Sequence, residues 1–109
     1  MLKMQVVMDY EKIRRDNVYD VDKIERAIDS VLLGEYGFMK HADGLYLESG
    51  KSDDYTNFWS AILLLKDEGW FLDNVKTWLW FNSDDSHDPE DFAVEDLRAH
   101  YVVRRKKSA

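Results

Sequence analysis

The apolar residues of this chain change their spacing along the sequence, and this change limits the folds that the chain can adopt. Within residues 19–34 they fall three or four apart, which places them on one face of a helix. Asp20 is a suitable N-cap for that helix, and Gly34 is a suitable end. Further along, Asp43 and Gly44 separate two short apolar and aromatic runs, which predicts a β-hairpin. The chain is therefore expected to contain both helices and strands.

The second half of the chain continues this mixture. Residues 54–68 follow Ser52-Asp53 and are apolar around most of a helix, which predicts a helix buried on more than one side. Val75–Phe81 is apolar on both faces of a strand, so we expect it centrally in a sheet covered on both sides. Asp73-Asn74 is expected to turn Trp70–Leu72 back onto that strand.

The two ends of the chain carry less specific signals. The first nine residues fit either a strand or the start of a helix. Asp88 followed by Pro89 predicts the start of a third helix, which Tyr101-Val102-Val103 would either end or follow as an edge strand. The expected class is α+β, with about three helices packed on a small, mostly antiparallel sheet of three or four strands.

The length of 109 residues fits a single domain. We expect residues 1–103 to form one compact domain and residues 104–109 to form a short basic tail that is frayed. The sequence has neither a signal-peptide core nor an apolar run of about 20 residues. The cytoplasm is therefore the expected compartment, with no membrane partner.

The chain is acidic, with 22 Asp and Glu against 15 Lys and Arg and a formal charge of −7. Such a charge opposes nucleic-acid binding over most of the surface, because that binding depends on cations that contact phosphates. The exception is the basic run Arg104-Arg105-Lys106-Lys107, which has the charge needed to touch a nucleic acid. An acidic body attracts a basic protein at long range.

Motifs for catalysis or metal binding do not emerge from the sequence. The chain has no cysteine, and His41, His87 and His100 do not form a pair at helical spacing. Carboxylates from Asp84 onward fall at some offsets of a calcium loop, but Pro89 stands where that loop needs glycine. Neither a nucleophile elbow nor a glycine-rich phosphate loop is present. We therefore predict no enzyme activity, no cofactor and no metal.

The aromatic content is the most unusual feature, with four tryptophans, six tyrosines and five phenylalanines. Tryptophan and tyrosine often anchor protein interfaces, and a domain of this size has difficulty covering so many rings. We therefore predict a small acidic protein-binding module, for example a neutralising or immunity-type partner of a basic protein. The expected partner-binding residues are Trp78, Trp80, Asp84, Asp85 and Asp88, with Asp53 and Asp54 behind them.

Two other functions remain open from the sequence. The same aromatic surface would also suit a homodimer closed by a two-fold contact. A small-molecule pocket is the second alternative, and we would expect it between the helix 54–68 and the sheet.

Overall fold

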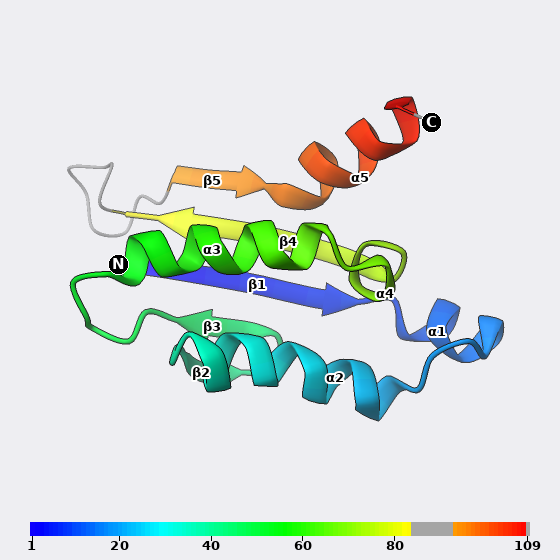
Figure 1. Ribbon diagram of the computed structural model, residues 1–109, viewed down its shortest axis with the longest axis horizontal. Helices are drawn as coiled ribbons and strands as arrows, with labels where there is room; N and C mark the ends of the chain where they lie inside the picture. Colours follow the sequence, from blue (N-terminus) through cyan, green and yellow to red (C-terminus); the bar gives the residue numbers. More distant parts are fainter. Residues whose placement is uncertain (84–92, 109) are drawn as a thin grey trace.

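The computed structural model describes residues 1–83 and 93–108, and the side chains up to residue 102 (Figure 1). Five antiparallel strands form one sheet in the order β2-β3-β1-β4-β5. The strands are β1 (Leu2–Met8), β2 (Met39–Ala42), β3 (Leu45–Leu47), β4 (Val75–Asn82) and β5 (Ala93–Asp96). The helices are α1 (Tyr10–Asp16), α2 (Val21–Asp29), η1 (Ser30–Glu35), α3 (Asp54–Lys66), α4 (Gly69–Leu72) and α5 (Leu97–Ser108). The predicted α+β class with an antiparallel sheet is confirmed, although fewer strands and helices were predicted.

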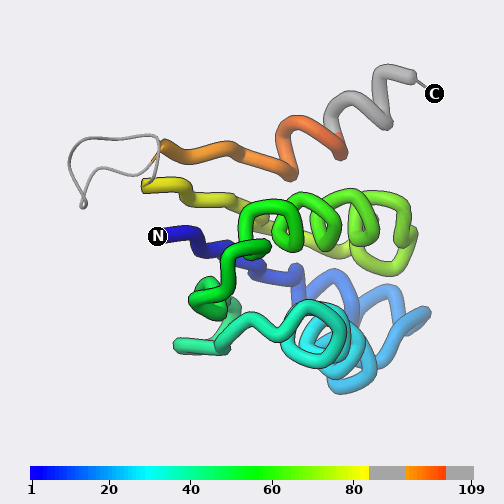
Figure 2. The backbone as a smooth tube through the Cα atoms, turned by 60° about the vertical axis from the view of Figure 1, so that its left-hand side comes forward, coloured from blue at the N-terminus to red at the C-terminus, as the bar shows by residue number. Residues whose placement is uncertain are grey.

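The chain order explains the layout of the sheet. The strands β1 to β4 and the helices between them follow the split β-α-β pattern, in which β1 lies between β3 and β4. The β1–β4 ladder is the longest, and it runs from Leu2 opposite Asn82 to Met8 opposite Val75. The helices α2 and α3 lie side by side over one face of the sheet (Figures 1 and 2). The molecule is thus a two-layer structure.

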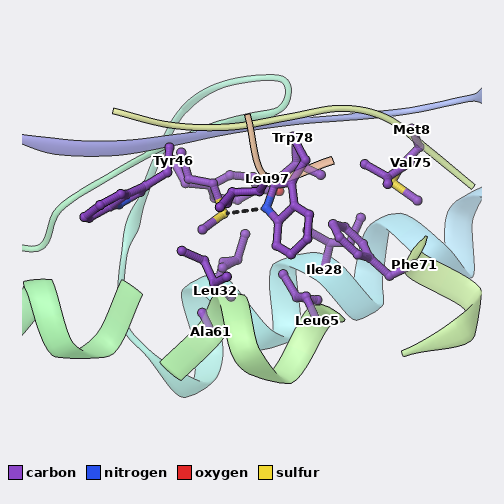
Figure 3. Close-up of a cluster of buried hydrophobic side chains, with 14 of the residues drawn as sticks. Met8, Ile28, Leu32, Tyr46, Ala61, Leu65, Phe71, Val75, Trp78 and Leu97 are labelled. Atoms are coloured by element: carbon purple, nitrogen blue, oxygen red, sulfur yellow. Dashed lines mark hydrogen bonds between the residues drawn. The ribbon is translucent and has the colours of Figure 1, made fainter. Parts of the chain in front are cut away.

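The core lies between the sheet and the helices. Along β1 every second residue is buried, beginning with Leu2, as expected for a strand with one covered face. Trp78 of β4 is fully buried and meets Phe71 of α4 edge-on, with 4.8 Å between the ring centroids (Figure 3). No helix within residues 1–83 and 93–108 is long and apolar enough to cross a membrane.

The structure corrects the prediction for β4. This strand is internal to the sheet, but within the described part of the chain the helices cover the face that carries Trp78 and Trp80, both of which are buried. Thr77, Leu79 and Phe81 alternate with them and are half-buried. The predicted hairpin partner, Trp70–Leu72, is instead part of the short helix α4.

The C-terminal part also differs from the prediction. Residues 93–96 form the strand β5 instead of a helix, because pairing with β4 satisfies backbone groups that β4 would otherwise leave open at the sheet edge. The last helix starts at Leu97, where the Asp96 carboxylate accepts a hydrogen bond from the Ala99 amide at 3.0 Å. It continues through residues 104–108, the expected tail. The predicted start at Asp88-Pro89 lies outside the described residues.

The start of the helix α2 was predicted correctly, and its end was not. The Asp20 carboxylate accepts hydrogen bonds from the amides of Asp22 and Lys23 at 2.8 and 3.2 Å. At the other end, the chain continues through Gly34 as the π-helix η1 and turns only at Gly37, which has φ +73°. A glycine at this positive φ avoids the strain that a Cβ atom would add.

The predicted hairpin at Asp43-Gly44 is present, and Gly44 is required there. Its φ is +76°, and a Cβ atom at this position would lie 2.4 Å from the Val6 carbonyl oxygen. We therefore expect Gly44→Ala to lower the free energy of unfolding by at least about 2 kcal/mol. Gly34→Ala is the matched control, because its Cβ atom meets nothing within 4 Å and alanine favours the helix. Urea denaturation of both variants measures the difference, and equal stabilities would contradict this account of Gly44.

Candidate functional site

A cleft of about 410 Å³ opens between α1, α2 and the β2–β3 hairpin. Its apolar lining residues are the buried Val6, Met8 and Ile28 and the half-buried Val21. Charged and phenolic groups also line it, and we call it the acidic cleft because its carboxylates outnumber its cations. These lining residues are the carboxylates Asp22, Glu25, Asp29 and Asp43, the cations Arg14 and Lys40, and the tyrosines Tyr10 and Tyr46.

Local structure places these groups around the cleft. The strand β1 passes directly into α1, and the Asp9 carboxylate caps that helix by accepting a hydrogen bond from the Lys12 amide at 3.1 Å. Tyr10 therefore stands at the first turn of α1, within reach of α2. On α2, Asp22, Glu25 and Asp29 are spaced by three and four residues, which puts them on one side of the helix.

Each tyrosine of the cleft donates a hydrogen bond to a carboxylate of α2. The Tyr10 hydroxyl donates to Glu25 Oε1 at 2.9 Å, and the Tyr46 hydroxyl donates to Asp29 Oδ1 at 2.6 Å. Lys40 Nζ forms an ion pair with Asp29 Oδ2 at 3.1 Å. These bonds tie α1 and the hairpin to α2 and hold the walls of the cleft in place.

The surroundings of both tyrosines keep their hydroxyls protonated. Burial, followed by the hydrogen bond to Glu25, raises the pKa of Tyr10 to about 12. Burial, and then the bond to Asp29, raises the pKa of Tyr46 well above its usual range. Both phenols are therefore protonated hydrogen-bond donors near neutral pH.

The structure buries Trp78 and Trp80, which were predicted to contact a partner. Their side chains are 0% and 3% exposed, because this face of β4 is packed under the helices. Trp59 lies edge-on to Trp80 with 5.0 Å between the ring centroids, and Tyr55 covers Trp80 from a centroid distance of 5.5 Å. The aromatic rings of β4 therefore form part of the core.

The predicted acidic contact residues differ in their positions and in their burial. Asp53 is exposed at the start of α3, as a surface contact requires. Asp54 is buried, and its carboxylate accepts hydrogen bonds from Ser49 and Gly50, so it has a structural role. Asp84, Asp85 and Asp88 lie outside the described residues.

Two further hollows, of about 570 and 450 Å³, share Val18 and Tyr19 of the α1–α2 loop. In the larger one, Lys12 Nζ donates to the Asp73 carbonyl oxygen and Arg98 Nε to that of Val75 at 3.0 Å. These two cations join elements of the fold, so a structural role accounts for them. A pocket was predicted between α3 and the sheet, but the three hollows described here lie elsewhere. Buried side chains of α3 fill the space between that helix and the sheet, namely Phe58, Ala61, Ile62 and Leu65.

The histidines and carboxylates of the described residues do not gather into a group of three or more that would suit a metal ion. His41 belongs to β2 and His100 to α5, which follows β5, so these two lie toward opposite edges of the sheet. His87 lies outside the described part of the chain.

Sequence reasoning missed the residues that form the acidic cleft. Tyr10 and Glu25 are 15 positions apart, and Tyr46 and Asp29 are 17 apart. Glu25 and Asp29 belong to the helix predicted from the apolar residues of 19–34, which did not select them as site residues, and no helix was predicted over residues 10–17. The helical spacing of the carboxylates was visible in the sequence, but the tyrosines opposite them depend on the tertiary fold.

Comparisons with protein families, curated proteins and solved structures found no match to this chain. The geometry and charge of the acidic cleft are therefore the basis for the function proposed below.

Proposed function

We propose that this protein is a small cytoplasmic protein-binding module for a basic partner, and that the acidic cleft receives a cationic side chain of that partner. The main support is the set of four carboxylates that line one cleft with only two cations. The formal charge of −7 would steer a basic protein toward the molecule before contact.

Arginine fits the acidic cleft better than lysine does. Its planar guanidinium group can donate two parallel hydrogen bonds to a carboxylate, and its aliphatic stem can pack on the half-buried Val21. The tyrosine rings already lie near cations of the chain itself. Arg14 Cζ is 5.9 Å from the ring centroid of Tyr10, and Lys40 Nζ is 5.8 Å from that of Tyr46. A bound guanidinium would find similar ring surface.

Binding accounts for the chemistry of the cleft more simply than catalysis does. The raised pKa values keep Tyr10 and Tyr46 protonated, and their hydroxyls are committed to Glu25 and Asp29. A nucleophile needs an adjacent base that takes its proton, and these two phenols are paired with carboxylates that stabilise the protonated form.

Neutralising Glu25 and Asp29 in the cleft is expected to weaken binding of a cation there. The probe is an acetylated and amidated peptide in which one arginine, flanked by leucines, carries the only charge. We expect Glu25→Gln combined with Asp29→Asn to weaken binding of this peptide about tenfold or more by calorimetric titration, because charge-assisted hydrogen bonds are lost. Raising the salt concentration should slow association far more than dissociation.

The control is Glu35→Gln combined with Asp67→Asn, which changes the net charge equally but lies outside the acidic cleft. We expect this variant to bind within about twofold of the original protein, and thermal melts verify that both variants are folded. Equal weakening in both variants would show that net charge alone attracts the peptide. Failure of the unmodified protein to bind the arginine peptide would also contradict the proposal.

A further inference from the structure

The chain itself places a cation in the acidic cleft. Lys40 lies on β2, the outermost strand at one end of the sheet order, directly opposite Tyr46 of β3. From there Lys40 Nζ donates to both carboxylate oxygens of Asp29, at 3.2 Å from Oδ1 and 3.1 Å from Oδ2. The same nitrogen is 5.8 Å from the ring centroid of Tyr46. Lys40 thus makes both kinds of contact that the proposed function gives to the partner's arginine, one with a carboxylate and one with a tyrosine ring.

The hydrogen bonds of Asp29 leave too few acceptor positions for an arginine beside Lys40. A carboxylate offers about four lone-pair positions, two on each oxygen. Asp29 Oδ1 accepts from the Tyr46 hydroxyl at 2.6 Å and from Lys40, so both of its positions are used, and Oδ2 also accepts from Lys40. A guanidinium that donates two parallel hydrogen bonds needs one position on each oxygen. An arginine can therefore form this pair with Asp29 only after one of the two present donors has left Oδ1.

Lys40 is the donor that can leave at low cost. The side chains of Lys40 and Asp29 are 34% and 32% exposed, and an ion pair that water reaches to this extent contributes little to stability. When it leaves, the Lys40 ammonium group can be solvated by water. Tyr46 is instead only 3% exposed, so its hydroxyl would be left buried without a partner.

Glu25 is the other carboxylate of α2 that a tyrosine of the cleft contacts, and an arginine on Glu25 would not disturb Lys40. Glu25 is exposed, however, whereas Asp29 is half-buried. A charge-assisted hydrogen bond is stronger where water screens it less, so Asp29 is the better acceptor for a guanidinium. We propose that Lys40 is an internal competitor for the acidic cleft, and that the partner's arginine displaces Lys40 Nζ from Asp29 when it binds. This inference rests on the proposed function, because it requires the acidic cleft to receive an arginine.

Calorimetric titration with the acetylated and amidated peptide that carries a single arginine tests the displacement. Lys40→Gln removes the competitor, so this variant should bind the peptide about two- to fivefold more tightly than the unmodified protein, the range expected for a partly exposed ion pair. Lys23→Gln is the matched control, because it removes the same charge from α2 and Lys23 does not line the acidic cleft. Its affinity should stay within about 1.5-fold of the original value.

A double-mutant cycle separates the ion pair from the local charge. In a protein that already carries Asp29→Asn, Lys40 no longer has a carboxylate to occupy. Adding Lys40→Gln to that protein should therefore change the affinity for the arginine peptide by less than about 1.5-fold. Thermal melts verify that each variant is folded.

The outcomes distinguish this inference from the proposed function. If the unmodified protein does not bind the arginine peptide, the proposed function is wrong and the inference is wrong with it. If the unmodified protein binds and Lys40→Gln binds no more tightly than Lys23→Gln, the proposed function stands and the displacement of Lys40 is wrong. A gain from Lys40→Gln that is equally large in the Asp29→Asn protein would also overturn the inference, because the positive charge of Lys40, and not its ion pair, would then oppose binding.

Discussion

Replacing Trp78 by alanine is expected to lower the free energy of unfolding by about 3–5 kcal/mol, the largest effect of any substitution considered for this protein. Trp78 is fully buried, its ring packs edge-on to Phe71, and its indole nitrogen donates to the Met4 sulfur at 3.4 Å. The centroid of its ring also lies 5.8 Å from that of the Tyr101 ring. The cavity left by the alanine substitution would therefore extend from the sheet to α5. Urea denaturation followed by far-ultraviolet circular dichroism measures the loss.

The matched control is Trp70→Ala. Trp70 is only half-buried, and its indole nitrogen donates to Glu68 at 2.9 Å near the surface. We expect less than half the loss found for Trp78→Ala, because less apolar area leaves the core. A Trp78→Ala variant that kept its stability but lost binding to the arginine peptide would restore the original interpretation of Trp78 as a contact residue and contradict its place in the core.

Replacing Asp54 by asparagine is expected to lower the free energy of unfolding by about 3 kcal/mol, which corresponds to a fall in melting temperature of roughly 13 °C. The Asp54 carboxylate is buried and accepts hydrogen bonds from the Ser49 amide, the Ser49 hydroxyl and the Gly50 amide at 3.2, 2.5 and 2.8 Å. The asparagine side chain has one acceptor oxygen where the carboxylate has two. Its NH2 group would therefore face one or more of the backbone and hydroxyl donors that now bind the carboxylate. Differential scanning calorimetry gives the melting temperature. Asp53→Asn is the control, because Asp53 is exposed and forms no side-chain cap.

The pH dependence of the stability of Asp54→Asn distinguishes the contribution of the Asp54 charge from that of the shape of the side chain. Burial by itself raises the pKa of Asp54, but the hydrogen bonds from Ser49, Gly50 and Lys51 outweigh it and hold the pKa below its usual value of 3.8. The stability that Asp54 contributes is therefore complete above about pH 4 and is lost as the pH falls through the lowered pKa. The stability gap between the unmodified protein and Asp54→Asn should narrow in that acidic range. A gap that stays constant there would contradict a role for the charge.

Local signals in the sequence were sufficient for some elements of the fold. The Asp20 cap and the Asp43-Gly44 turn depend on a few neighbouring residues, so the sequence alone predicted them. The strand β5 depends on the unpaired edge of β4, and a window of sequence contains no information about that edge. The apolar pattern of Val75–Phe81 had the same limit, because it does not distinguish a face covered by helices from a face left open.

The candidate site was harder to predict than the fold. A search for exposed aromatic residues selected Trp78 and Trp80, which the fold uses to build its core. The acidic cleft depends on two hydrogen bonds between elements, Tyr10 to Glu25 and Tyr46 to Asp29. Each pair joins α2 to a segment that contacts it only in the folded protein. The regular spacing of residues in a helix or strand therefore does not predict which residues form these pairs.

The central position of β1 determines the order in which the sheet can assemble. Leu2 pairs with Asn82, so β1 cannot form its longer ladder until β4, about 75 residues later in the chain, has been synthesised. Contacts this distant in sequence slow folding, because closing a long loop lowers the chain entropy before the contacts can stabilise the fold. Until then β1 can pair only with β3, and its other edge stays available to foreign strands. Aggregation during synthesis should therefore depend on how quickly the chain beyond residue 82 emerges.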